Sequence, residues 1–504
     1  MDAVAKNESI GSRVRRFFLG ASASTKEERR LVRKLDFFIM VYCCLSYFST
    51  FLVRTNRAAF ANAYVAGLRE DLDMTGGDYS NVLAVTTAGM AIGQLPHGIV
   101  IQKVAPRIWF PSMVVIWAGL TMASAAAKTV TQLCVIRFFL GLAEASTYAG
   151  AIYIISSWYK PDEISKRTAL FTASGQVGTM FAGVMMAAIH KGMNGMSGLQ
   201  GWQWVFLIDG IITLPIAVFG FLYFPDTPDR TQAGYLSADE KKLARSRLPA
   251  ICEDGHNIMP LSLVKRVLMA PILLAGFFFF WSPVCAAIEA FPFQNNFLLW
   301  LKYQSDHFTQ TQINTYPLGV QAVGIVANML AAWHMDATGK RIPAAIVAIL
   351  FQVVVGSMLL VRDIPFAGTF FAFYLSGTAY AVNPLIFGWA GLILQRSGDD
   401  AVRSVTLYSM NIGSMVLWTF WGILFYSGAD TPYWKKGCIV LLVCCFVMFC
   451  YMWLVYKVDK HTAKKYRDRM PGAIDPEAKL PESIEMAEQD VPTIAEKNGD
   501  KITS

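Results

Sequence analysis

The chain has 504 residues, of which 54% are hydrophobic and 16% charged, with a mean hydropathy of +0.40 and a formal net charge of +8. A soluble domain of this length cannot bury so much apolar surface, so the composition excludes a soluble globular protein and places the excess against lipid. We predict an all-α protein of the lipid bilayer, with no nucleic-acid partner, because the basic residues are distributed as a membrane topology requires.

Twelve apolar runs are long enough to cross roughly 30 Å of hydrocarbon as helices. They cover residues 35–66, 80–101, 109–127, 132–157, 168–189, 204–224, 270–300, 313–335, 343–361, 366–394, 405–426 and 437–456. The tail over residues 1–34 is polar and basic and has no cleavable signal sequence, so we expect the first run to be the insertion signal.

The lysines and arginines indicate which side each loop faces. With the N-terminus in the cytoplasm, the inner segments hold 34 of the 44 Lys and Arg residues. This asymmetry follows the positive-inside rule and predicts that both termini are cytoplasmic. The C-terminal tail, residues 457–504, becomes acidic and proline-punctuated, so we expect it to be disordered.

A polar central loop over residues 225–269 divides the spans six and six. We therefore predict an N-terminal six-helix half over residues 35–224 and a C-terminal half over residues 270–456. The first span begins near Leu35 and the seventh near Ala270, and we call the separation between these two starting points the repeat offset. Two parallel structural repeats should show corresponding features at this offset.

Two cytoplasmic loops carry similar charged motifs close to the repeat offset. The loop between the eighth and ninth spans combines an acid with a glycine and two bases, and these are Asp336, Gly339, Lys340 and Arg341. The corresponding loop between the second and third spans has Lys103 and Arg107 but carries Gln102 where the acid would stand. Both loops resemble the loop signature of the major facilitator superfamily. The resemblance implies a twelve-helix fold whose halves alternate access to a central site, with these six charged and glycine residues setting the balance between states.

The fourth span contains Arg137 and, seven residues later, Glu144. Residues at this spacing share one helix face and lie about 10 Å apart along its axis. An ionised group deep in lipid costs several kcal/mol, so both side chains must face a cavity or a partner. Two interpretations follow: an internal ion network that only packs the bundle, or an anion-binding arginine above a protonatable carboxylate.

The first span continues with small and apolar residues past Asn56 and Arg57 as far as Gly67. This pattern predicts one long helix with Arg57 buried in its outer half. The alternative ends the helix at Val53 and leaves Arg57 in an outer loop.

The first and fourth spans resemble the anion:cation symporter branch of the superfamily, especially its fungal allantoate and pantothenate permeases. The resemblance covers nearly all of residues 25–460 and rests on four stretches besides the Arg137–Glu144 pair: residues 33–36, 62–72, 201–204 and 225–228. Residues 299–302 and 312–317 look most like pantothenate-type members. Many members carry an acid beside the arginine of the first span, and here that acid is missing. Either Glu144 is then the only proton carrier of this half, or the coupling is altered.

Other intramembrane polar groups give weaker signals. Asp209 and Glu289 are expected near the outer ends of their spans, where they can reach the interface. Asn383 and Asn411 interrupt apolar spans and either line the cavity or bond a neighbouring helix. Four aromatic residues are candidates for stacking on a solute or for packing between helices, and these are Trp281, Tyr316, Trp389 and Trp418.

The sequence contains no Walker loop, metal-ligand cluster or nucleophile–base arrangement, so we predict neither a cofactor, a metal nor an enzyme. We expect a monomeric plasma-membrane transporter that imports a small carboxylate such as pantothenate together with protons. Arg57, Arg137, Asn56, Tyr316, Asn383, Trp389 and Asn411 are the predicted substrate-binding residues. Two alternatives are an exporter of an acidic metabolite on the same fold and a non-transporting nutrient sensor.

Overall fold

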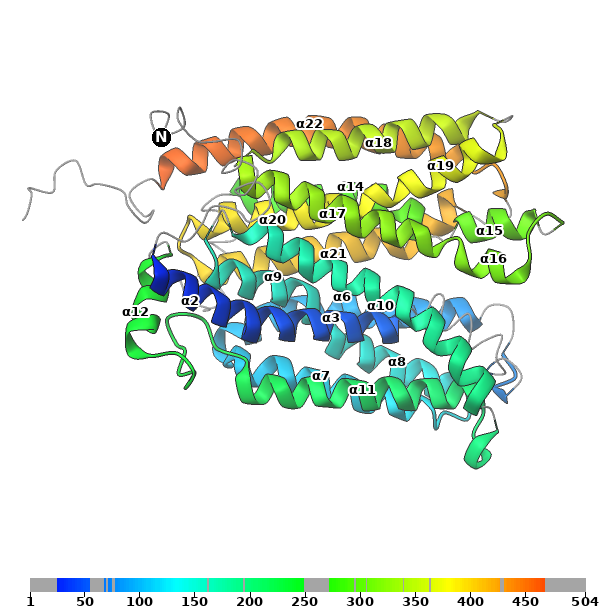
Figure 1. Cartoon of the computed structure of the whole chain (residues 1–504), viewed down its shortest axis with the longest axis horizontal. Coiled ribbons are helices and arrows are strands. Elements are labelled where there is room, and N and C mark those ends of the chain that lie inside the picture. Colours follow the sequence, from blue (N-terminus) through cyan, green and yellow to red (C-terminus); the bar gives the residue numbers. More distant parts are fainter. Residues whose placement is uncertain are drawn as a thin grey trace, which may run out of the picture.

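The computed structural model describes residues 25–54, 68, 71–74, 78–160, 163–193, 195–248, 272–293, 296–304, 306–338, 340–361, 364–426 and 430–466. In this part of the chain the regular structure is helical, and long helices lie side by side in one bundle (Figure 1). The described residues of each of the twelve predicted spans lie on one long helix or on a run of consecutive helices, which confirms the predicted fold class.

The N-terminal half contains the six predicted spans before the central loop. Its helical segments are α2 (Lys26–Leu35), the π-helical turn η2 (Asp36–Met40), α3 (Val41–Arg54), α6 (Asp78–Lys103), α7 (Pro106–Ser124), α8 (Val130–Glu144), α9 (Thr147–Trp158), α10 (Ile164–Met193), η5 (Met196–Gly198) and α11 (Gly201–Tyr223). A short amphipathic helix, α12 (Ala238–Ser246), follows in the central loop. The first span begins earlier than predicted, because α2 and η2 run directly into α3.

The C-terminal half repeats this plan. Its segments are α14 (Ile272–Phe293), α15 (Asn296–Tyr303), α16 (Gln310–Thr315), α17 (Leu318–Thr338), α18 (Ile342–Leu360), α19 (Phe366–Ser376), the 3-10 turn η6 (Gly377–Ala381), α20 (Val382–Gln395), α21 (Asp400–Phe425) and α22 (Lys435–Lys465). Figure 1 shows the N-terminal half below and the C-terminal half above. We call the end that carries the start of α2, helix α12 and the last turns of α22 the tail end of the bundle.

The outside of the bundle is apolar. Phe446 is 70% exposed and Leu222 67% exposed, whereas Arg137 and Glu144 are buried between helices. Eight helical segments of the described residues are long and apolar enough to cross a membrane by length and composition. Apolar side chains outside and charged ones inside are the arrangement that a bilayer imposes.

Close helix crossings recur in the two halves. A Cβ atom added at Gly89 of α6 would lie 2.2 Å from the carbonyl oxygen of Phe138, and one at Gly141 of α8 would lie 2.3 Å from that of Thr86. In the other half, a Cβ at Gly377 would lie 2.3 Å from the carbonyl oxygen of Val320 and 3.2 Å from the backbone nitrogen of Gly324. The repeat offset relates Gly89 to Gly324, and it relates Gly141 to Gly377 to within a single position. The second and fourth spans of each half therefore share the same small-residue contact, as expected of a repeat.

Candidate functional site

Helix α8 buries an arginine inside the N-terminal half. The helix begins at a Thr129 cap, whose side-chain oxygen accepts a hydrogen bond from the backbone nitrogen of Gln132 at 3.2 Å. Two turns later, Arg137 is 1% exposed, and its guanidinium carbon lies 4.8 Å from the centre of the Phe206 ring of α11. This geometry is a cation–π contact, so in this conformation Arg137 faces α11.

Two carboxylates lie within electrostatic range of Arg137, and they are Glu144 and Asp209. Asp209 stands three residues after Phe206 on α11 and is 2% exposed. The expectation that Asp209 reaches the membrane interface is therefore wrong, because neighbouring helices cover it. We call Arg137, Glu144 and Asp209 the N-half charge cluster. When all three are ionised, it carries one net negative charge.

Glu144 is buried at a break in the fourth span. It is the last residue of α8, and α9 begins at Thr147. Directly after it, the carbonyl oxygen of Ser146 accepts a hydrogen bond from the hydroxyl of Tyr408 on α21 at 3.4 Å. The segment that holds the carboxylate therefore touches the opposite half, so movement between the halves can alter the surroundings of Glu144.

Glu289 is also buried, being 3% exposed, and the expectation that it reaches the interface is wrong. Its Oε1 accepts a hydrogen bond from the backbone nitrogen of Asn383, and its Oε2 accepts one from Asn383 Nδ2, both at 3.2 Å. Asn383 lies in the middle of the rod formed by α19, η6 and α20, and α15 extends the seventh span beyond α14. Glu289 therefore lies near mid-depth of the bundle.

The sequence indicated two candidate asparagines. Asn383 is hydrogen-bonded to Glu289, and Asn411 is buried within α21. Asn383 is only half-buried, and its Oδ1 has no hydrogen-bond partner among the described residues. Asn383 is therefore the candidate that keeps an acceptor atom available.

The candidate aromatic residues lie in packed surroundings. Trp389 donates a hydrogen bond from Nε1 to Asp459 Oδ2 of α22 at 3.0 Å, which ties α20 to α22 inside the C-terminal half. Trp418 donates to the carbonyl oxygen of Ala286 at 2.9 Å, and the Trp281 ring contacts Trp389 edge-on. In this conformation these three indoles pack helices together.

Tyr316 lies in a separate aromatic cluster of the C-terminal half. Its ring centre is 5.6 Å from that of Phe370, and its hydroxyl accepts a hydrogen bond from Gln312 Nε2 at 3.0 Å. The cluster lies beside α15 and α16, at the opposite end of the bundle from the tail end (Figure 1). The structure does not bring Tyr316 to the N-half charge cluster.

An acidic residue from a distant part of the chain pairs with the loop between α6 and α7. Arg107 Nε lies 3.3 Å from Asp226 Oδ2, and the backbone nitrogen of Arg107 donates to Asp226 Oδ1 at 3.2 Å. Burial raises the pKa of Asp226, and the contacts with Arg107 act in the opposite direction. Asp226 thus supplies the charge that Gln102 lacks, while Lys103 is exposed at the end of α6. The carbonyl oxygen of Gln102 accepts a hydrogen bond from Arg230 Nη1 at 2.8 Å.

Part of the remaining prediction lies outside the described residues. This applies to Asn56, Arg57 and Gly339, and to the side chain of Asp336. In the second loop, the backbone nitrogen of Lys340 donates to Thr338 Oγ1 at 3.2 Å, and Arg341 is the N-cap residue of α18. The length of the first span therefore stays a prediction.

Sequence reasoning missed the residues that join the halves at the tail end. Arg403 of α21 is buried, forms an ion pair with Asp400 at 2.8 Å, and donates to the carbonyl oxygen of Ser156 at 3.1 Å and to Ser157 Oγ at 2.7 Å. Gln395 donates from Nε2 to the same Ser156 carbonyl at 2.8 Å. The run of charged residues after Gly398, next to the start of a predicted span, is the sequence feature that could have pointed to these residues.

Further bonds between the halves lie in the same part of the bundle. Ser404 donates from Oγ to the carbonyl oxygen of Gly98 at 2.9 Å, near the tail end of α6. Asn328 of α17 donates from Nδ2 to the carbonyl oxygen of Ala169 at 3.1 Å and to Thr172 Oγ1 at 2.7 Å, in the first turns of α10. These contacts hold the two halves together on the tail side of the bundle.

The structure is thus a twelve-helix bundle of two similar halves, which polar contacts join on one side. The family model described as Major Facilitator Superfamily matches residues 46–399, which is well over half of the chain. The chain belongs to the major facilitator superfamily. The resemblance of its two charged loops to that superfamily is thereby confirmed, and the protein is a transporter of this superfamily rather than an enzyme.

Curated relatives cover most of the chain. It is 37% identical to the pantothenate transporter liz1 of Schizosaccharomyces pombe over 450 residues, which are 88% of this chain and 85% of that one. It is 35% identical to the pantothenate transporter FEN2 of Saccharomyces cerevisiae, over 82% of this chain and 81% of that one. These matches confirm the resemblance to the fungal pantothenate group.

Solved structures agree with the fold. The proton:xylose symporter XylE aligns with a TM-score of 0.64 over 84% of this chain and 96% of its own, at 13% identity. At such low identity the likeness shows the major facilitator fold alone.

Proposed function

We propose that this protein is a plasma-membrane importer that carries pantothenate, or a closely related small carboxylate, together with protons. The observation that carries the proposal is the pair of relatives named as pantothenate transporters, each at least 35% identical over more than four fifths of the chain. The buried arginine and carboxylate on α8 support it chemically, because an anion needs a cation to bind and a coupled proton needs a group to carry it.

Alternating access supplies the mechanism. The basic N-terminal tail and inner loops assign the tail end of the bundle to the cytoplasm, with both termini there. The contacts from Arg403 to Ser156 and Ser157 then close the cytoplasmic side. In this state the solute enters from outside, and rocking of the halves breaks these contacts to release it inside.

Three of the predicted site residues have a role in this cycle. Arg137, together with Arg57 at the outer half of the first span, attracts the carboxylate. Glu144 carries the proton, and its link through Ser146 to Tyr408 relates its protonation to the position of the other half. The transporter works as a monomer in the bilayer, because each chain contains both halves.

Uptake of radiolabelled pantothenate tests the proposal in cells that lack their own pantothenate transporter. We expect uptake to rise as external pH falls from about 7.5 to about 5 and to collapse with a protonophore, because an inward proton gradient drives accumulation. Uptake that ignores the protonophore would disprove proton coupling. Release from preloaded cells without uptake would assign export instead.

A further inference from the structure

We infer that Glu289, Asn383 and Tyr148 form the part of the substrate site that binds the hydroxyl and amide donors of the solute. This inference rests on the proposed function and identifies the residues that read the uncharged end of the same solute. It assigns a recognition role to Glu289 and Tyr148 at the surface where the two halves meet.

Glu289 and Asn383 are hydrogen-bonded to each other in the C-terminal half. Both carboxylate oxygens of Glu289 are held by Asn383, one through the backbone nitrogen and one through the side-chain amide, each at 3.2 Å. A carboxylate oxygen has two lone pairs, so each can accept a second hydrogen bond. The Oδ1 atom of Asn383 is buried without a hydrogen-bond partner among the residues that the structure describes. The pair therefore offers several acceptor atoms to an incoming group.

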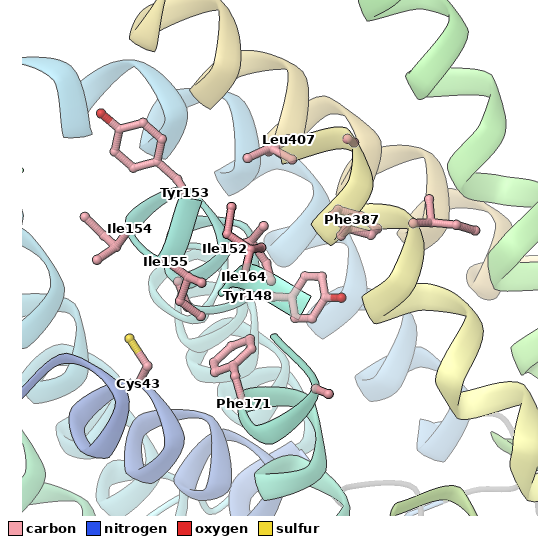
Figure 2. Close-up of a cluster of buried hydrophobic side chains, with 14 of the residues drawn as sticks. Cys43, Tyr148, Ile152, Tyr153, Ile154, Ile155, Ile164, Phe171, Phe387 and Leu407 are labelled. Carbon is pink, nitrogen blue, oxygen red and sulfur yellow. The ribbon is translucent and has the colours of Figure 1, made fainter. Parts of the chain in front are cut away.

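Tyr148 belongs to the N-terminal half and lies in the same region. Figure 2 shows its ring between Phe171 of its own half and Phe387 of the other half, and the ring centres of Tyr148 and Phe387 lie 5.1 Å apart. Within the described part of the chain, the hydroxyl of Tyr148 is buried without a hydrogen-bond partner, and it lies within electrostatic range of Glu289. A buried hydroxyl without a partner is costly, and a bound solute would satisfy it.

The repeat gives independent support. The repeat offset relates Arg54, the last residue of α3, to Glu289, and to within a single position it relates Tyr148 to Asn383. The C-terminal half thus places an acid where the N-terminal half places an arginine, and it pairs that acid with the counterpart of Tyr148. The two repeats meet at a shared central axis, and such transporters bind their solutes at this interface between the repeats.

The chemistry then decides which end of the solute these residues bind. The oxygens of Glu289 and Asn383 accept hydrogen bonds from hydroxyl and amide groups, whereas a carboxylate has no hydrogen to donate to them. Pantothenate carries a carboxylate at one end and an amide and two hydroxyls toward the other. With the carboxylate near the arginines of the N-terminal half, the hydroxyl end is the part that suits Glu289 and Asn383.

A substrate-analogue comparison tests this assignment on the full-length transporter. The probes are pantothenate and its dideoxy analogue, in which both hydroxyls are replaced by hydrogen, and each is measured as a competitor of labelled pantothenate uptake. We expect the wild type to prefer pantothenate by about tenfold or more, because the dideoxy analogue loses two hydrogen bonds and leaves buried acceptors unsatisfied. Glu289→Gln should reduce that preference to about threefold or less, while the penalty for converting the carboxylate to an amide stays as in the wild type.

Tyr148→Phe is the second variant, because it keeps the ring contacts of Figure 2 and removes only the hydroxyl. It should also weaken the preference for pantothenate over the dideoxy analogue, and it keeps the inference testable if Glu289→Gln does not fold. Unchanged preference in a folded variant, with normal wild-type uptake, would overturn the inference alone. Absence of pantothenate uptake by the wild type would overturn the proposed function and this inference with it.

Discussion

Arg403 of α21 donates a hydrogen bond from Nη2 to Oγ of Ser157 on α9 at 2.7 Å, and this bond crosses from one six-helix half to the other. The same guanidinium also bonds the carbonyl oxygen of Ser156 and pairs with Asp400. A single buried side chain thus makes several of the contacts that close the tail side. Its removal should open that side more readily than removal of an arginine that bonds within one half.

Arg403→Ala is expected to shift the protein toward the state that is open at the tail end. The readout is maleimide labelling of a cysteine introduced at Thr168, which is buried where α10 faces α20. We expect its labelling rate to rise about tenfold, because charge-assisted hydrogen bonds between the halves are lost. Arg396→Ala is the matched control, since Arg396 pairs with Asp459 inside the C-terminal half. Equal labelling in the two variants would contradict a gating role for Arg403.

A second prediction concerns Arg107 and Asp226. Asp226→Asn keeps an oxygen that can accept the backbone hydrogen bond from Arg107 and removes only the charge. Because the Arg107 side chain is 45% exposed, we expect a loss of about 1 kcal/mol or less. In a double-mutant cycle with Arg107→Gln, measured by thermal unfolding in detergent, the two losses should not add. Fully additive losses would show that the ion pair contributes nothing.

The spans, the two halves and the repeat could be predicted because hydropathy and loop charge are local properties of the sequence. The partner of Arg107 could not, since Asp226 lies 119 residues away and only the packing of α7 against the end of α11 brings them together. The same holds for Arg403 and Ser157, which are 246 residues apart.

The depth of a buried acid in the bilayer was also predicted wrongly from the sequence. Counting along a single apolar run placed Glu289 near the outer end of its span. Its contact with Asn383, in the middle of the tenth span, places it near mid-depth instead. Asp209 was misplaced for a related reason, because the sequence alone does not show that Arg137 and Phe206 cover that face of α11.

A third prediction tests the helix crossing that both halves share. Gly141→Ala places a methyl group 2.3 Å from the carbonyl oxygen of Thr86, and backbone cannot yield as a flexible side chain can. We expect a destabilisation of about 1–3 kcal/mol, seen as a lower melting temperature and less folded protein. Gly119→Ala is the control, since a Cβ there meets nothing within 4 Å, and it should be neutral or slightly stabilising. Equal melting temperatures for the two variants would exclude a close crossing at Gly141.

A fourth prediction concerns the proton. Glu144→Gln should abolish accumulation of pantothenate but keep exchange of labelled for unlabelled solute across the membrane. Exchange needs only the site and its rocking, whereas net accumulation needs a group that binds and releases a proton, which an amide cannot do. Parallel uptake and counterflow assays in proteoliposomes separate the two activities. Normal accumulation by Glu144→Gln would move the carrier to another buried acid, with Asp209 and Glu289 as the next candidates.

The last prediction asks whether Arg137 reads the carboxylate or only packs against α11. The guanidinium already has the Phe206 ring on one side and Asp209 nearby, so a purely structural role would lower thermal stability without changing which analogues are accepted. If Arg137 binds the solute, its loss should weaken pantothenate binding by about 2 kcal/mol, or roughly thirtyfold.

Arg137→Lys should recover only part of that loss, because ammonium lacks the two-pronged fit of guanidinium to carboxylate. The decisive measurement compares pantothenate with its carboxamide analogue as competitors of uptake. The wild type should reject the amide strongly, and Arg137→Ala should reject it much less, since the charge that distinguishes carboxylate from amide is then gone. Identical rejection by both proteins, together with a lowered melting temperature of the variant, would assign Arg137 to the packing of the N-half charge cluster. The carboxylate would then have to be bound by another cation, for which Arg57 is the remaining candidate from the sequence.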